Sequence, residues 1–176
     1  MVSASNASGE SVNSAEVSVT PVAGVSSLKV QYKAGDATAS SNQIKPQFTL
    51  VNTGASAIAL SELKIRYWYT ADGSQSQQFW VDWAVVGAAN ITGSVTKLAT
   101  ARSGADSYVE VGFTAGAGSL AANGTSGDIQ TRINKSDWTN YTQTGDYSFD
   151  ATKSAFADWT KVTLYRNGTL VWGTEP

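Results

Sequence analysis

VTLYRNGTLVW, residues 162–172, has the sequence pattern of a β-hairpin. Apolar residues alternate with polar ones on both sides of the pair Asn167-Gly168. Asn and Gly both tolerate positive φ, so the pair suits the two central positions of a type I′ turn. The end of the chain therefore predicts two short strands joined by a tight turn.

Short alternating runs separated by turn signals extend from this hairpin back to residue 27, with little helical periodicity. Within 63–69, for example, Lys64, Arg66 and Trp68 share one face of a strand. Roughly nine short strands at regular spacing predict an all-β fold, an antiparallel β-sandwich. Besides the hairpin, the strands are expected at 28–32, 47–52, 63–69, 77–83, 95–100, 108–113 and 129–133.

The composition excludes several classes of function. The 176 residues suffice for one domain with a real core, and 12 basic against 14 acidic residues, scattered along the chain, argue against nucleic-acid binding. No segment is long and apolar enough for a membrane span. The chain has no Cys and no His, which excludes thiolate chemistry, a Ser-His-Asp triad and a histidine-bound metal. Metal chemistry is left with oxygen ligands, which suit calcium.

The first 24 residues are rich in Ser, Ala, Asn and Val and show no long apolar period. They lack the basic start and the continuous apolar run of a signal peptide. We interpret 1–24 as a flexible linker remnant behind an added Met, and 25–176 as a module excised from a longer protein.

Residues 79–83, Phe-Trp-Val-Asp-Trp, place a carboxylate among large aromatic side chains. Regular strand alternation would put Phe79, Val81 and Trp83 on one face, so at least one of the two Trp residues of this segment would be structural. Asp82 needs a partner if it is buried, and Arg132 at the end of another predicted strand is available. The pair Asp82–Arg132 is either part of a flat ligand-binding strip or an ordinary surface ion pair.

Residues 130–149 form a polar stretch that is unusually rich in aromatic side chains. Loops seldom keep a Trp exposed to water, so Trp138 either faces a flat ligand such as a sugar ring or folds back into its own loop.

Six blocks of sequence follow one another in order across nearly the whole domain: NQIKPQFTLVNTG (42–54), LSELKIRYWYTADG (60–73), FWVDWA (79–84), ADSYVEVGF (105–113), GDIQTRINKSDWTNYTQTGDYSF (127–149) and LYRNGTLVWGTEP (164–176). Together they resemble the family 3 carbohydrate-binding modules of bacterial cellulases, most closely the endoglucanase type. The resemblance implies a jelly-roll β-sandwich that binds cellulose without catalysis.

The resemblance implies a ligand strip in which an Asp–Arg ion pair lies in line with aromatic rings. Asp82 and Arg132 match the pair, Trp138 matches the aromatic beyond the Arg, and Trp83 stands where relatives usually have His or Tyr. By the same matching, Asn42 and Gln130 would anchor a neighbouring glucan chain. With Trp138 in the strip, we expect Trp138 outside and Tyr147 and Phe149 inside. The chain is shorter after Gly87 than scaffold-type members and lacks the Tyr that extends their strip.

The resemblance also implies one structural calcium. Its ligands map to Thr70 and Asp72 in one loop and to Thr142, Gly145 and Asp146 in another. Two distant loops then each offer a carboxylate with hydroxyl or carbonyl oxygens, a donor set that calcium accepts. From the residues alone, the same loops could be two ordinary Asx turns.

Three classes of function are compared. A glycosidase needs two carboxylates across a cleft, one with a raised pKa, and Asp82 paired with Arg132 does not meet that need. A helper module that packs on a catalytic domain, without binding crystalline cellulose itself, is the alternative, and the strip residues argue against it. We therefore expect a secreted, monomeric, non-catalytic module whose partners are cellulose or a related β-glucan and a glycoside hydrolase domain in the parent chain.

Overall fold

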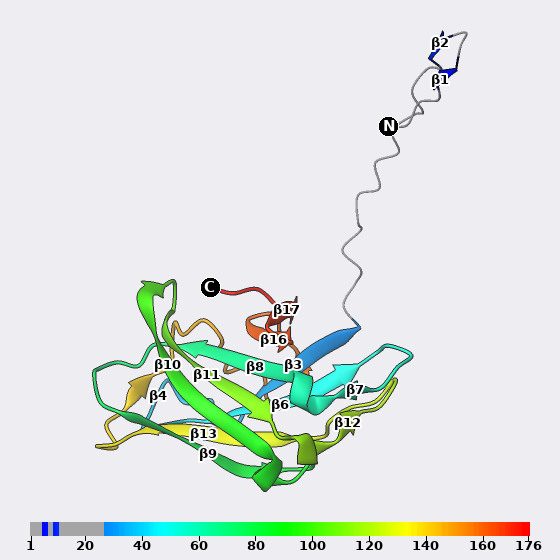
Figure 1. The fold of residues 1–176 in the computed structure, drawn as a ribbon. Coiled ribbons are helices and arrows are strands. Elements are labelled where there is room, and N and C mark those ends of the chain that lie inside the picture. Colours follow the sequence, from blue (N-terminus) through cyan, green and yellow to red (C-terminus); the bar gives the residue numbers. More distant parts are fainter. Residues whose placement is uncertain (1–4, 7–8, 11–26) are drawn as a thin grey trace.

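The computed structural model describes residues 5–6, 9–10 and 27–176 (Figure 1). Most of the predicted linker 1–24 lies outside the described residues. The two described parts of it, β1 (Ser5–Asn6) and β2 (Gly9–Glu10), pair as short antiparallel strands. Among the described residues, no helix has the length and apolar character needed to cross a membrane.

One layer of the domain is a five-stranded antiparallel sheet in the order β10-β11-β8-β16-β17 (Figure 1). The hairpin predicted at the end of the chain is its β16–β17 edge, with Asn167 (φ 50°) and Gly168 (φ 82°) in the turn. Both residues have the positive φ that a type I′ turn requires, which confirms the hairpin. The strands are β8 (Leu63–Tyr69), β10 (Ile91–Arg102), β11 (Ala105–Phe113), β16 (Val162–Arg166) and β17 (Thr169–Trp172).

The other layer is a six-stranded sheet built around β13, which pairs with β6 and β5 along one edge and with β9 along the other. Figure 1 shows β9 and β13 below the layer of β8, β10 and β11. The strands are β3 (Leu28–Ala34), β5 (Gln43–Ile44), β6 (Pro46–Asn52), β9 (Gln77–Ala84), β13 (Ile129–Lys135) and β15 (Ala157–Asp158).

Short elements connect the two layers. Four two-residue strands form two further pairs, β12 with β7 and β14 with β4. Three 3-10 turns complete the connections. These elements are β4 (Ser40–Ser41), β7 (Ile58–Ala59), β12 (Ser119–Leu120), β14 (Tyr141–Thr142), η1 (Leu60–Glu62), η2 (Ala88–Asn90) and η3 (Ala115–Ala117).

The core lies between the two sheets and follows from strand alternation. Inward residues of both sheets, such as Phe48, Ile65, Val111, Ile133 and Leu164, are fully buried in one apolar cluster. After β6 the chain changes from one sheet to the other at each of β8, β9, β10, β13 and β16. Nine of the described strands have four residues or more. The predicted all-β antiparallel sandwich with jelly-roll topology and roughly nine strands is confirmed.

The edges of the two sheets meet where β9 passes β10. A Cβ atom added at Gly93 of β10 would lie 2.2 Å from two ring carbons of Phe79 on β9. Because real Cβ atoms do not approach carbon so closely, Gly93 leaves the space that the half-buried Phe79 ring fills.

We therefore expect Gly93→Ala to displace the Phe79 ring and to lower the free energy of unfolding by about 1–3 kcal/mol, the usual cost of overpacking. Urea unfolding of this variant measures the effect. Ser94→Ala, an exposed change at the next position of β10, is the control and should stay within about 0.5 kcal/mol of the parent. Equal stability of the two variants would show that the contact does not constrain the edge.

Candidate functional site

A β-bulge in β9 decides which of its side chains face outward on the six-stranded sheet. Trp83 pairs with Gln130 and Val81 with Thr131, so Asp82 is the extra residue between them. A bulge of this kind breaks the two-residue alternation of a strand. Trp80, Asp82 and Trp83 are therefore all on the solvent side, and Ala84 is buried.

This arrangement corrects one expectation from the sequence. Regular alternation placed Trp83 on the same face as Phe79 and Val81 and made at least one Trp of the segment structural. Trp80 is 45% exposed and Trp83 is 49% exposed, so neither is a core residue. The expectation was wrong because the inserted Asp82 reverses the alternation just before Trp83.

Asp82 and Arg132 form an ion pair on this face, with 3.1 Å between Asp82 Oδ1 and Arg132 Nε. The Nε–H bond of Arg132 does not point at the Asp82 oxygen, so this contact is an ion pair without a hydrogen bond from Nε. Both side chains are more than a third exposed, so the pair contributes at most about 1 kcal/mol to stability. Its importance lies in its position, since it spans β9 and β13.

Trp80 is a member of this face that the sequence analysis missed. It pairs with Arg132 across the two strands, and the guanidinium carbon lies 5.7 Å from its ring centroid, within cation–π range. Its indole Nε1 donates a hydrogen bond to Asn134 Oδ1 at 2.8 Å. The sequence offered one indication, two Trp residues close to an Asp within five positions. Only the bulge at Asp82 places both Trp side chains on the solvent side of the sheet.

Trp138 lies in the turn that follows β13, and its backbone N–H donates to Lys135 O at 3.1 Å. It is 51% exposed and has φ 59°, a left-handed conformation that a bulky residue seldom adopts. Trp138 is thus outside, as expected. Tyr147 and Phe149, expected inside, are only half-buried, and Tyr147 Oη donates to Thr174 O at 2.9 Å in a solvent-exposed contact.

The two predicted anchoring residues lie at opposite ends of β13. Gln130 is half-buried and directly opposite Trp83, so it borders the ion pair. Asn42 is exposed and precedes Gln43, which pairs with Asn134. The span from Gln130 to the end of β13 is about 17 Å at ~3.3 Å per residue. We use the name tryptophan strip for Trp80, Asp82, Trp83 and Arg132 on this face, together with the exposed Trp138 in the turn that follows β13.

The loops predicted to hold a metal are joined to each other through their carboxylates. Asp146 Oδ1 accepts a hydrogen bond from Thr70 N at 2.8 Å, and Asp72 Oδ2 accepts one from Thr142 N at 2.5 Å. Gly145, the fifth predicted ligand, is exposed at φ 93° next to Asp146. The residues predicted from the two loops therefore gather in one region. The sequence analysis missed Asp106, whose Oδ1 accepts from Ala71 N at 2.8 Å.

Asp146 has the properties expected of a carboxylate that binds a cation. It is 5% exposed, and its Oδ2 is buried without a hydrogen-bond partner. Burial, with the charges of Asp72 and Asp106 adding to it, raises the pKa of Asp146 to about 7. Within the described ranges no three acidic side chains form a metal cluster. The residues fit a calcium ion held by two carboxylates together with threonine and carbonyl oxygens.

The fold and its outward tryptophans define a β-sandwich carbohydrate-binding module. The chain belongs to the cellulose binding domain family, family 3 of these modules, whose model matches residues 29–173. It is 50% identical over 152 residues to an endoglucanase A of Paenibacillus lautus and 49% identical over 150 residues to a xyloglucanase of a Paenibacillus species. The aligned residues are 86% and 85% of this chain but only 21% and 14% of those two enzymes.

Solved structures agree with this family. The module CBM3b of the major scaffoldin subunit ScaA from Acetivibrio cellulolyticus superposes with a TM-score of 0.83 at 45% identity. The match covers 86% of this chain and 99% of that module. The fold match thus extends over practically all of the solved module.

In calcium-free solution with a chelator, we expect the free energy of unfolding to fall as the pH rises from 5 to 8. The folded chain keeps a proton on Asp146 up to about pH 7, whereas a free Asp releases it near 3.8. Stability is therefore lost as the pH rises through the folded pKa. Urea unfolding at several pH values measures the slope. Asp146→Asn should flatten it, and an equal slope in parent and variant would contradict the role of Asp146.

Proposed function

We propose that this chain is a non-catalytic module that binds cellulose through the tryptophan strip. The observation that supports the proposal most strongly is the presence of two half-exposed Trp side chains, Trp80 and Trp83, beside the ion pair Asp82–Arg132, with a third half-exposed Trp, Trp138, in the turn after β13. Exposed Trp side chains on one face are unfavourable in water, so they indicate a ligand surface. Flat apolar rings with polar groups between them suit the apolar faces and the hydroxyl edges of a glucan chain.

The expected affinity follows from the area of the rings. Covering one face of a Trp removes roughly 80–100 Å² of apolar surface from water, or about 2 kcal/mol at ~25 cal/mol/Å². Two or three such platforms with several hydrogen bonds offset the cost of association and leave roughly micromolar affinity. A module that holds a linked enzyme near an insoluble substrate needs no more, because the link raises the effective concentration of the enzyme.

We further propose that the module is extracellular, acts as a monomer and is linked to a glycoside hydrolase domain. The Paenibacillus relatives support the link to a glycoside hydrolase domain, since the matching part is a small share of enzymes named for activity on glucans. A helper module that only packs on a catalytic domain would have no use for an exposed strip. Catalysis by this domain itself is disfavoured, because the carboxylate with a raised pKa, Asp146, is buried under loops rather than facing a cleft.

The first test is a pull-down of the chain on microcrystalline cellulose. Trp138→Ala should weaken binding by roughly 10- to 30-fold, because it removes one platform worth about 2 kcal/mol. Leu170→Ala is the matched control, since Leu170 is also an exposed large apolar residue but belongs to the other sheet. Native-like binding by Trp138→Ala would refute the strip, and absence of binding by the parent chain would favour the helper module.

We also propose that a calcium ion ties the loop of Thr70 and Asp72 to the loop of Thr142, Gly145 and Asp146. The unpartnered Asp146 Oδ2 supports this, because an ionised buried carboxylate needs a compensating charge. The ion would supply structural cross-linking rather than chemistry on a substrate.

Calcium should therefore raise the thermal midpoint at pH 8 relative to the same protein in a chelator. An ion present at 100 times its dissociation constant stabilises the native state by about 2.7 kcal/mol, or roughly 5–10 °C for a domain of this size. Scanning calorimetry with calcium, with magnesium and with chelator measures the shift. Asp146→Asn should lose most of the calcium response, and an unchanged midpoint of the parent would count against the site.

A further inference from the structure

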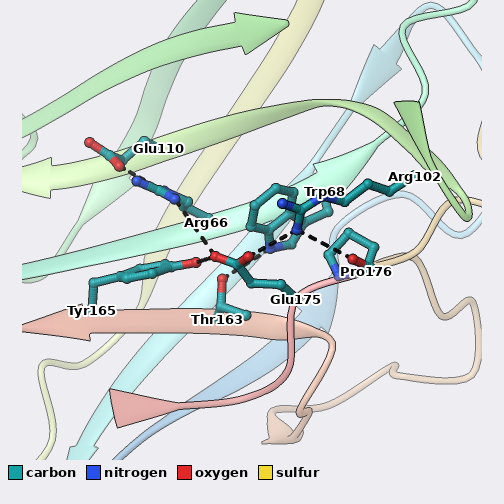
Figure 2. Close-up of polar contacts among 8 residues, drawn as sticks. All are labelled: Arg66, Trp68, Arg102, Glu110, Thr163, Tyr165, Glu175 and Pro176. Carbon is teal, nitrogen blue, oxygen red and sulfur yellow. Dashed lines mark hydrogen bonds and ion pairs between the residues drawn. The ribbon is translucent and has the colours of Figure 1, made fainter. Parts of the chain in front are cut away.

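Among the described residues, Trp80 is the only tryptophan of the strip whose indole N–H has a protein acceptor. Such a bond is usual for a buried tryptophan, because an unpartnered donor is costly away from water. Trp68 on the other sheet is an example: it is 1% exposed, and its Nε1 donates to Thr163 Oγ1 at 2.9 Å (Figure 2). Trp80 is 45% exposed and still donates to Asn134 Oδ1 at 2.8 Å. The acceptor therefore fixes the position of an exposed ring.

Asn134 provides this acceptor from β13 and is itself fully buried. In the register of β9 and β13, Trp80 lies opposite Arg132, and Asn134 lies opposite Gln78 (Figure 1). The indole hydrogen bond thus crosses between the strands on a diagonal, to the residue two positions beyond the direct partner. The exposed fraction of Asn134 is 0%, so it does not contact a ligand on the surface. Any influence of Asn134 on a ligand has to pass through the side chains that it holds.

Both ends of the Asn134 amide are hydrogen-bonded. Its Oδ1 accepts from Trp80, and its Nδ2 donates to Lys135 O at 3.0 Å and to Gln78 Oε1 at 3.4 Å. A side-chain amide has one acceptor oxygen and two donor hydrogens, so each of them is used. Turning the amide over would place its NH2 group against the indole N–H and its oxygen against two other oxygens, which is unfavourable in a buried position. The amide therefore has a single orientation.

The carbonyl oxygen of Lys135 connects this amide to the turn of Trp138. Lys135 O accepts one hydrogen bond from Asn134 Nδ2 at 3.0 Å and another from Trp138 N at 3.1 Å. The side chain of Lys135 is 1% exposed, and its Nζ donates to carbonyl oxygens in two loops, which holds the residue in place. Asn134 is thus joined at one end to the ring of Trp80 and at the other to a fixed point of the backbone.

The ring that Asn134 holds lies beside the cation of the strip. The guanidinium carbon of Arg132 is 5.7 Å from the Trp80 ring centroid, and Arg132 Nε is 3.1 Å from Asp82 Oδ1. A ring in one orientation presents a constant face to the guanidinium group, whereas a free ring would occupy several rotamers. Fixing an exposed side chain before the ligand arrives lowers the entropy cost of binding.

We propose that Asn134 is a positioning residue of the tryptophan strip, which fixes the Trp80 ring beside Arg132 and pre-organises the strip for a flat glucan surface. Asn134 does not touch the ligand and acts through the indole N–H of Trp80. This inference rests on the proposed function of the strip and adds to it a residue that the ligand does not reach. Loss of the hydrogen bond therefore lowers the affinity without removing a group that contacts the ligand.

The test combines retention on microcrystalline cellulose with the NMR signal of the Trp80 indole N–H in the free protein. Asn134→Leu removes the acceptor at similar side-chain volume and should weaken binding roughly 3- to 10-fold, the usual effect of losing one hydrogen bond. In the parent chain, the indole N–H of Trp80 should exchange with water more slowly than that of Trp83. In Asn134→Leu the two exchange rates should be similar. Asn134→Ala serves the same purpose if the leucine variant does not fold.

Asn52→Leu is the matched control. Asn52 is also 0% exposed, but its side chain bonds to backbone groups of Gly54, Ser56 and Ala121, none of which belongs to the strip. This variant should bind cellulose like the parent. Urea unfolding of every variant shows that binding is measured on folded protein.

A double-mutant cycle separates positioning from a general structural role. Trp80→Phe keeps an aromatic ring at an exposed site and removes the indole N–H. In that background, Asn134→Leu should change the affinity by less than about 2-fold, because the bond through which Asn134 acts is already absent.

A parent chain that does not bind cellulose would refute the proposed function of the strip and this inference with it. Binding by the parent and equal binding by Asn134→Leu would overturn the inference alone. Two further results would also overturn it: equal losses from Asn134→Leu with and without Trp80→Phe, or exchange of the Trp80 indole N–H in the parent as fast as that of Trp83.

Discussion

The extra residue that β9 carries opposite Gln130 and Thr131 is the constraint on which the ligand face depends. A regular strand gives only every second residue to one side of a sheet. By inserting Asp82, the bulge places Trp80 and Trp83 on the same side and leaves Phe79 directed to the gap at Gly93. The bulge interrupts the hydrogen-bond ladder between β9 and β13 at one position. It creates a surface on which two tryptophans and a carboxylate lie beside Arg132.

A buried lysine at the end of β13, Lys135, links the loop of Asp72 and the loop of Asn140 to the strand that carries Arg132. Lys135 is 1% exposed, and its Nζ donates to the carbonyl oxygens of Asp72 and Asn140. It also lies 4.6 Å from the ring centroid of Tyr141. The last residue of β13 therefore joins the two loops that would hold calcium, and the turn of Trp138 begins at that residue. An ion that stiffens these loops would also limit the motion of Trp138.

Features set by local sequence were predicted well, and features set by tertiary register were not. The Asn167-Gly168 turn and the alternation of 63–69 fixed the hairpin and β8, because turn chemistry and strand period act over a few residues. The pairing of Asp82 with Arg132 was expected from the need of a carboxylate for a partner. Strand alternation could not give the outward position of Trp83, which only the family resemblance implied, since a bulge depends on how two distant strands align. Trp68 shares a strand face with Lys64 and Arg66 as predicted, but its burial could not be predicted, because it depends on contacts with distant residues such as Tyr108 and Thr163.

The sandwich thus presents two chemically different faces, an aromatic strip on one sheet and, on the other, the ion pairs Arg66–Glu110 and Arg102–Glu175. The most direct test of the central claim is hydroxyl-radical footprinting of the chain while it is bound to microcrystalline cellulose. We predict that oxidation of Trp80, Trp83 and Trp138 falls severalfold on binding, whereas oxidation of Leu170 on the opposite sheet does not change. Unchanged oxidation of all three tryptophans in the bound chain, or protection of the five-stranded face instead, would contradict the account.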